Sequence, residues 1–337
     1  MTKHPFKKAM TGIMTAIAAM SIATTSWATA PTVVWQTSNV KTGYPNAIFS
    51  VDGTVVLVFK TTGFEVRRAS DGVLLNTLTL PAASQAYDAA AFSPDKTLIG
   101  LTLFNNAIGT IEIWKISTGT LQRTITTDAV RNMKGLDFSS NGLIASRERF
   151  AYGGGGNLRV YRVSDGTLVK KLGPVARNSA PGGVQFSPNA ADVAVNDTFS
   201  LGGVFVLRTS DWGTARSVTG AGIFSWVSDS GSIWTDAFQQ IRISDGAILR
   251  SVTLNGSTGV TAVTPDNRFL FAYDFINGTA SNTIKFVRTS DGGTQLVYTL
   301  GSGQVVWSNQ VSPLQTLFTY EICPSLCNVY VAQMPSL

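Results

Sequence analysis

Short apolar runs alternate with turn-forming residues along almost the whole of this 337-residue chain. The runs are rich in β-branched residues, as in "TVVLVF" and "LIGLTLF", and no segment beyond residue 28 keeps a helical period. A turn signature precedes these runs seven times: an apolar residue, then Ser or Thr, then mostly Pro, Asp, Asn or Gly. The copies are "FSVDG" at 49, "FSPDK" at 92, "FSSNG" at 138, "FSPNA" at 186, "VSDSG" at 227, "VTPDN" at 263 and "VSPLQ" at 311, at intervals of 36 to 48 residues.

A second signature follows in six of the seven repeats. It reads "RRASDG", "WKISTG", "YRVSDG", "LRTSDW", "IRISDG" and "VRTSDG" in chain order. An apolar run precedes it and a shorter run follows, with glycine at the left-handed position of the turn in nearly every copy, which is the pattern of a β-hairpin. Each repeat is therefore predicted to hold four antiparallel strands, a to d, with the first signature joining a to b and the second joining c to d.

Seven such units predict an all-β fold, a seven-bladed β-propeller of four-stranded antiparallel blades. The blades are expected at about 43–80, 86–127, 132–173, 181–219, 221–254, 258–300 and 304–334. The seventh unit ends after its third strand. We expect residues 32–38 near the N-terminus to supply the missing outer strand and so close the ring.

The first 28 residues have the pattern of a cleaved signal peptide. Three lysines and no acid precede an apolar stretch of small residues, and Ser26 and Ala28 suit the −3 and −1 positions of a cleavage site. Ala30 offers a second site, although a proline would follow that cut. Residues 1–28 are therefore predicted to be a leader and 29–337 a single domain, periplasmic or secreted, with no later transmembrane segment.

Removal of the leader changes the available chemistry. The charge falls from +6 to +3, with 23 basic and 20 acidic residues left, which is too small a balance to predict a nucleic-acid partner. His4 is the only histidine and leaves with the leader, which excludes Ser-His-Asp, Cys-His and histidine-metal sites. We predict no cofactor or metal, because no acid cluster has calcium-loop spacing and "GGGG" at 153–156 lacks the Lys-Ser/Thr of a phosphate loop.

The repeats resemble those of the WD-repeat propellers over nearly the whole chain after the leader, in a degenerate, secreted bacterial form. "FSPD" and "IEIWKISTG" carry the resemblance. The Trp-Asp pair that names the family is absent, as is its Gly-His pair. The Trp-Asp place holds Arg67-Arg68, Trp114-Lys115, Tyr161-Arg162, Leu207-Arg208, Ile241-Arg242 and Val287-Arg288. The resemblance therefore implies the fold, while cohesion between strands is expected from packing.

Two cysteines, Cys323 and Cys327, stand near the C-terminus with three residues between them. Export to an oxidising compartment favours a disulfide between them, and a tight turn can bring them within bonding range. The alternative, a redox-active pair, calls for a smaller spacing and a strand-to-helix context.

Charged residues recur at fixed places in the repeats. Strands a and c end on one face of the disc and strand b ends on the other. Six repeats have a cation at the end of strand c, which predicts a basic ring on that face. Its members are Arg68, Lys115, Arg162, Arg208, Arg242 and Arg288. The end of strand b predicts an acidic ring of Glu148, Asp197, Asp236, Asp274 and Glu321, with Lys60 and Asn105 at this place in the first two blades.

Two interpretations of these rings stay open. In the first, the acids cap turns and the cations bond turn carbonyls or a neighbouring acid. In the second, the basic ring binds an anionic surface such as a cell-wall polymer, lipid headgroups or an acidic protein patch.

Variable connections such as "AYGGGGN" and "GPVARNSAPGG" belong to the acidic face, and recognition commonly resides in variable loops on a rigid scaffold. The sequence therefore predicts an exported, monomeric, non-catalytic propeller that serves as a protein-interaction platform through that face. The alternative is a lactonase- or hydrolase-like propeller enzyme acting on a small molecule in the central channel, which convergent polar groups at the channel mouth would favour.

Overall fold

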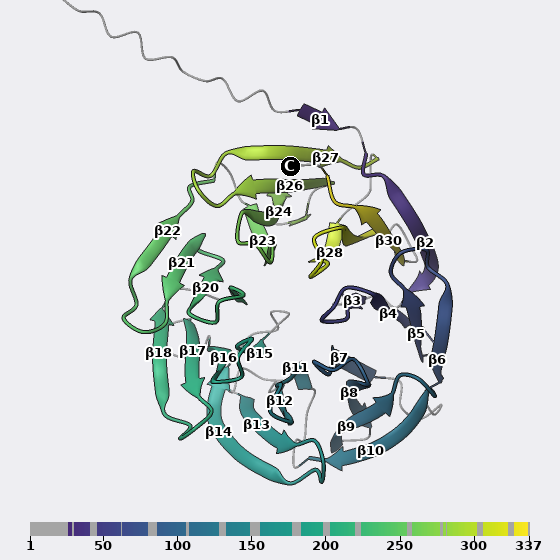
Figure 1. The fold of residues 1–337 in the computed structure, drawn as a ribbon, viewed down its shortest axis with the longest axis vertical. Helices are drawn as coiled ribbons and strands as arrows, with labels where there is room; N and C mark the ends of the chain where they lie inside the picture. Colours follow the sequence, from purple (N-terminus) through teal and green to yellow (C-terminus); the bar gives the residue numbers. More distant parts are fainter. Residues whose placement is uncertain are drawn as a thin grey trace, which may run out of the picture.

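The computed structural model arranges seven blades side by side around a central axis (Figure 1), and one pairing, Val40 with Lys60, joins the sheets of blades seven and one. It describes residues 26–28, 30–40, 46–61, 63–79, 86–105, 108–127, 133–148, 156–176, 183–197, 203–219, 224–254, 258–276, 279–280, 282–301, 306–322 and 327–335. Every regular element within these ranges is a β-strand, and no helix there is long and apolar enough to cross a membrane. The predicted all-β, seven-bladed architecture is confirmed.

The strands run in the order a to d from the axis to the rim. Blade one holds β3 (Ala47–Phe49), β4 (Val55–Lys60), β5 (Gly63–Arg68) and β6 (Leu74–Thr79). Blade two holds β7 (Ala86–Phe92), β8 (Leu98–Asn105), β9 (Ile108–Lys115) and β10 (Thr120–Thr126). Blade three holds β11 (Met133–Phe138), β12 (Leu143–Glu148), β13 (Gly156–Arg162) and β14 (Leu168–Ala176). Blade four holds β15 (Val184–Phe186), β16 (Asp192–Asp197), β17 (Gly203–Arg208) and β18 (Thr214–Thr219).

The remaining three blades follow the same plan with two additions. Blade five holds β19 (Phe224–Trp226), β20 (Ser232–Thr235), β21 (Gln239–Arg242) and β22 (Ile248–Ser251). Blade six holds β23 (Thr258–Val263), β24 (Phe269–Ile276), β26 (Thr283–Arg288) and β27 (Thr294–Thr299), and β25 (Thr279–Ala280) pairs with the end of β24. Blade seven holds β28 (Val306–Val311), β29 (Leu317–Ile322), β30 (Cys327–Gln333) and, from the N-terminus, β2 (Val33–Val40).

Burial falls from the axis to the rim, which explains the composition of the strands. Each residue of the b strand β29 is buried, whereas each residue of the d strand β22 is exposed. The inner strands are covered by a neighbouring blade on both faces and so need apolar residues on both faces. The outer strands diverge from their neighbours and carry mostly polar residues.

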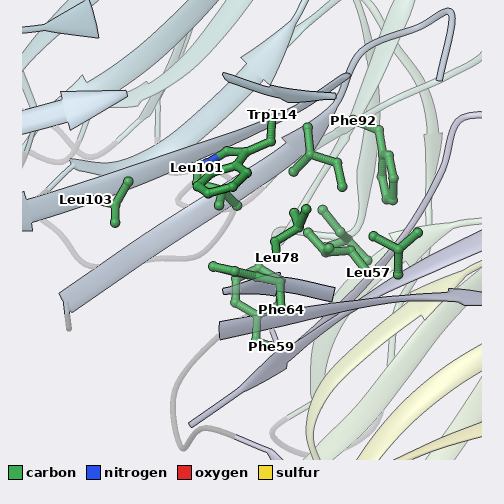
Figure 2. Packing of buried hydrophobic residues seen from close by; sticks show 11 residues of the cluster. Leu57, Phe59, Phe64, Leu78, Phe92, Leu101, Leu103 and Trp114 are labelled. Atoms are coloured by element: carbon green, nitrogen blue, oxygen red, sulfur yellow. The ribbon is translucent and has the colours of Figure 1, made fainter. Parts of the chain in front are cut away.

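Seven apolar clusters hold the ring together, and each one lies between two adjacent blades. Figure 2 shows the cluster between blades one and two, where Leu57 and Phe64 of blade one face Leu101 and Trp114 of blade two. A further cluster joins blade seven to blade one, so the packing is continuous around the ring. A single blade cannot bury its own faces, and its stability therefore depends on both neighbours.

The N-terminal strand closes the ring as predicted. Strand β2 pairs antiparallel with β30, with Trp35 opposite Val331. The Trp35 indole Nε1 donates a 2.8 Å hydrogen bond to the carbonyl oxygen of Ala69 in blade one. Lys60 of blade one reaches back to β2, where its Nζ donates to Thr37 Oγ1 at 2.9 Å. Closure thus combines strand pairing with contacts between the first and last blades.

One short strand lies outside this plan. Strand β1 (Ser26–Ala28) pairs parallel with β27, the outer strand of blade six, with Trp27 opposite Val297 (Figure 1). These three residues belong to the end of the predicted leader. Every strand of the seven four-stranded blades lies after Ala30, and so outside the predicted leader.

Candidate functional site

In blades one to six, the chain reverses twice per blade on each face of the disc. The a–b and c–d turns lie on one face, which we call the turn face. The b–c turns and the connections between blades lie on the other, which we call the loop face. Every a–b and c–d turn lies within the described residues, whereas several loop-face connections lie outside them.

The a–b turns satisfy their own polar groups. In blade one, Ser50 Oγ donates to Asp52 Oδ1 at 2.7 Å and accepts the backbone N–H of Val55 at 3.1 Å. Blade two repeats the arrangement with Ser93 and Asp95, whose pKa is lowered chiefly by the hydrogen bond from Ser93. In blade five the turn begins at Trp226, one residue earlier than the repeat pattern predicts. Val227 therefore stands where blade one has Ser50.

Five of the six cations of the predicted basic ring form an ion pair inside their own c–d turn. The partner is always the aspartate of the "SDG" or "SDW" signature, three residues later, at 2.8–3.0 Å. The pairs are Arg68–Asp71, Arg162–Asp165, Arg208–Asp211, Arg242–Asp245 and Arg288–Asp291. The sixth cation, Lys115, has Thr118 at the aspartate position.

These pairs make most of the turn face locally neutral. Hydrogen bonds from the backbone of Thr167 and from Arg162 lower the pKa of Asp165 to about 2. Since both partners are close to half exposed, water screens the attraction and each pair contributes little to stability. The arrangement fits the first interpretation of the basic ring, local bonding within the turn.

A second set of contacts, which the sequence analysis missed, ties neighbouring blades together on the turn face. A side-chain donor on each of several outer strands bonds the c–d turn of the next blade. The donors and acceptors are Trp35 to Ala69 O, Asn76 to Ile116 O, Arg123 to Ser164 O, Arg216 to Ser244 O and Arg250 to Thr289 Oγ1, at 2.7–3.0 Å. In blades one, two, four and five the donor stands four residues after the residue at the left-handed turn position, so a signal was present in the sequence.

We expect Arg123→Ala to lower the free energy of unfolding by about 1 kcal/mol, because its guanidinium donates to the carbonyl oxygens of both Ser164 and Asp165. Arg162→Ala is the matched control and should leave stability unchanged. Urea denaturation followed by tryptophan fluorescence measures both variants. If both variants lost the same free energy of unfolding, the hydrogen bonds between blades would stabilise the ring no more than the ion pairs within turns do.

Polar side chains of the inner strands also link blades. Asp137 of β11 accepts the backbone N–H of Phe186 in blade four at 2.6 Å, and burial raises its pKa to about 7. Gln310 of β28 accepts the backbone N–H of Phe49 in blade one at 3.2 Å. Both residues precede the apolar residue of their a–b signature. Each bonds the next blade, and these contacts assign them a structural role.

The carboxylates of the predicted acidic ring do not share one environment. Glu321 is buried, with only 1% of its surface exposed, and the amide of Asn46 in blade one donates a hydrogen bond to it. Burial raises its pKa to about 8, although that hydrogen bond opposes the shift. Glu321 is expected in an acidic ring on one face of the disc, but it lies buried inside the joint between blades seven and one.

The other members of that ring are only partly placed. Asp236 is half-buried in the turn that follows β20. The backbones of Glu148 and Asp197 end β12 and β16, and that of Asp274 lies in β24, while their side chains fall outside the described residues. Asn105 ends β8 in the same way. An acidic ring formed by these residues stays a prediction.

Cys327 is disulfide-bonded and 1% exposed. The only other cysteine of the sequence is Cys323, which lies outside the described residues. Cys327 starts β30, the strand on which β2 docks. The disulfide therefore borders the closure of the ring.

In the part of the chain that the structure describes, no set of three or more His, Cys, Asp or Glu side chains could hold a metal ion. A partly open cavity of about 380 Å³ lies between blades two and three and is lined by Leu98, Ile113, Gln122, Arg123, Val163 and Ser164. The Arg123 guanidinium already donates hydrogen bonds to turn carbonyl oxygens, and no other charged side chain of the described residues lines this cavity, so it offers no acid–base pair.

Comparison with solved structures agrees with this geometry. A chain from the crystal structure of the mitotic checkpoint complex superposes with a TM-score of 0.71 at 13% identity, covering 99% of this chain and 98% of that one. The C-terminal WD40 domain of Sif2 superposes with a TM-score of 0.65 at 11% identity, covering 91% and 99%. The fold is a WD-repeat-like seven-bladed β-propeller. No protein-family profile and no curated protein matches the sequence of the propeller.

Proposed function

We propose that the propeller is exported and acts as a non-catalytic platform that binds a protein partner through its loop face. The observation that carries the choice of face is the self-pairing of the turn face. Its serines, aspartates and arginines bond within their own turns or to the next blade, and five of the six ring cations are already paired. The variable connections therefore provide the surface on which recognition can differ without disturbing the ring.

Two further observations support a platform. Histidine is confined to position 4, and many of the described carboxylates, such as Asp71 and Asp165 in turns and Asp137 and Glu321 between blades, already bond other groups, which leaves little for acid–base chemistry. One solved structure of the same fold is part of an assembly, the mitotic checkpoint complex, which is consistent with a binding role for this propeller. Export is supported by the leader pattern of residues 1–28.

Cross-linking can identify the binding face, because lysines are distributed over both. Lys60 ends β4 toward the loop face, whereas Lys96 and Lys115 lie on the turn face. We expect an amine-reactive cross-linker to join the partner from the exported fraction to Lys60. Cross-links confined to Lys96 and Lys115 would contradict the proposal.

Reversing the ring charge tests the alternative, an anionic surface bound by the basic ring. A triple variant, Arg68→Glu, Arg162→Glu and Arg242→Glu, should capture the same partners as the unmodified protein, with the same dependence on salt. Loss of capture, or a much weaker salt dependence, would support the anionic-surface interpretation instead. Thermal unfolding of the variant confirms that the ring is intact.

A further inference from the structure

The outer strand of blade six differs from the other outer strands at one position. This position lies one residue after the donor position and faces away from the next blade. The other six blades place a polar, exposed residue there: Gln36, Thr77, Thr124, Lys171, Ser217 and Ser251. Blade six has Val297, which is only 5% exposed.

The neighbouring positions explain why blade six is free to differ. Its donor position is Leu296, which packs in the cluster between blades six and seven. Blade seven ends with strand c and has no c–d turn, so a donor at that place would have no carbonyl to reach. That reason accounts for Leu296 but not for Val297, whose side chain points the opposite way.

Strand β1 lies beside Val297, on the free edge of β27. It pairs parallel with β27 in the register Ser26–Leu296, Trp27–Val297 and Ala28–Tyr298. Among the described blades, one other outer strand pairs along its outer edge: the end of β2 pairs antiparallel with β4 of blade one, with Val40 opposite Lys60. An apolar, β-branched edge that is left open invites strand addition, and folded proteins normally protect such edges with charge or cover. Here the cover is a segment that the proposed cleavage after Ala28 would remove.

We infer that the free edge of blade six is a strand-docking site. In the precursor Ser26–Ala28 occupy it. In the cleaved protein it takes an extended peptide of a partner, added parallel to β27, with a bulky apolar residue between small ones opposite Val297. Backbone hydrogen bonds hold such a strand, and the side chain opposite Val297 sets its register. This inference rests on the proposed leader cleavage, and it names a binding edge in addition to the loop face.

The probe is a fluorescent peptide of residues 24–30, "TTSWATA", titrated into a chain that starts at Thr29. Saturable binding is expected. A chain that starts at Thr24 keeps β1 and should bind the peptide roughly tenfold more weakly, about 1.4 kcal/mol, because its own strand competes. A peptide with proline at both Trp27 and Ala28 should not bind, since successive N–H groups alternate sides and one of the two must face β27.

Val297→Lys should abolish binding, because it places a charge where blade three carries Lys171. Thr124→Lys, at the matching place in blade two, is the control and should not affect binding. If Val297→Lys unfolds at a lower temperature than Thr124→Lys, Val297→Thr is tested in its place and should also abolish binding. Binding that survives both Val297 variants, absence of binding, or self-association of the Thr29 chain through this edge would overturn the inference. Because purified chains are used, failure here is separate from failure of export or of loop-face recognition.

Discussion

Trp35→Ala should lower the free energy of unfolding by roughly 3–5 kcal/mol, the usual cost of truncating a buried tryptophan. Trp35 is 8% exposed, packs in the cluster between blades seven and one, and bonds the carbonyl of Ala69. Its ring also lies against Gly72, where an added Cβ would come within 2.7 Å of the indole. The substitution therefore weakens the strand that closes the ring.

Chemical denaturation of the chain that starts at Thr29 measures this effect. Gln36→Ala is the matched control, because Gln36 is the next residue of β2 and is exposed. It should change stability by less than about 0.5 kcal/mol. If Trp35→Ala were no more destabilising than Gln36→Ala, β2 would not be a structural part of the last blade.

Buried Glu321 should make the protein less stable as the pH rises from about 4.5 to 8, and Glu321→Gln should remove this loss of stability. Burial raises the pKa of Glu321 from 4.5 to about 8 in the folded protein. Below pH 4.5 the group is protonated in both states and costs nothing. Between 4.5 and 8 only the unfolded chain releases the proton, so the folded state loses stability as pH rises, and above 8 the loss levels off.

The variant keeps an acceptor oxygen for Asn46, and its stability should match the parent at pH 4.5. At pH 8 it should be the more stable protein by a few kcal/mol, since each unit of pKa shift corresponds to about 1.4 kcal/mol. Asp137, whose pKa burial raises to about 7, destabilises both proteins alike and cancels in the difference. Parallel stability curves for parent and variant across this range would contradict the buried position of Glu321.

The repeat was visible in the sequence because its turns need particular residues. Ser50 and Asp52 satisfy a tight a–b turn, and the glycine of "SDG" takes a left-handed conformation, with φ of 73° at Gly72. The period of these turns determines the number of blades. The missing outer strand of the seventh unit then identifies the closing strand, which the pairing of β2 with β30 confirms.

The role of the charges could not be predicted from position along a strand. Arg68 and Asp71 stand three residues apart in the sequence, but only the turn geometry shows that they neutralise each other. Glu321 stands at the same place in its repeat as Glu148, yet lies inside the joint between the first and last blades, where the Asn46 amide meets it. This contact joins residues of the first and last blades that are far apart in the chain, and the repeat pattern carries no information about it.

Paired cysteines test ring closure most directly. Gln36 of β2 lies opposite Tyr330 of β30, and directly opposed residues of antiparallel strands are close enough for a disulfide. In the chain that starts at Thr29, Gln36→Cys combined with Tyr330→Cys should form an intramolecular disulfide in the monomer, found by peptide mapping beside the native bond. A chain that forms no such bond, or that forms it only between two molecules, would contradict closure of the seven blades by their own first strand.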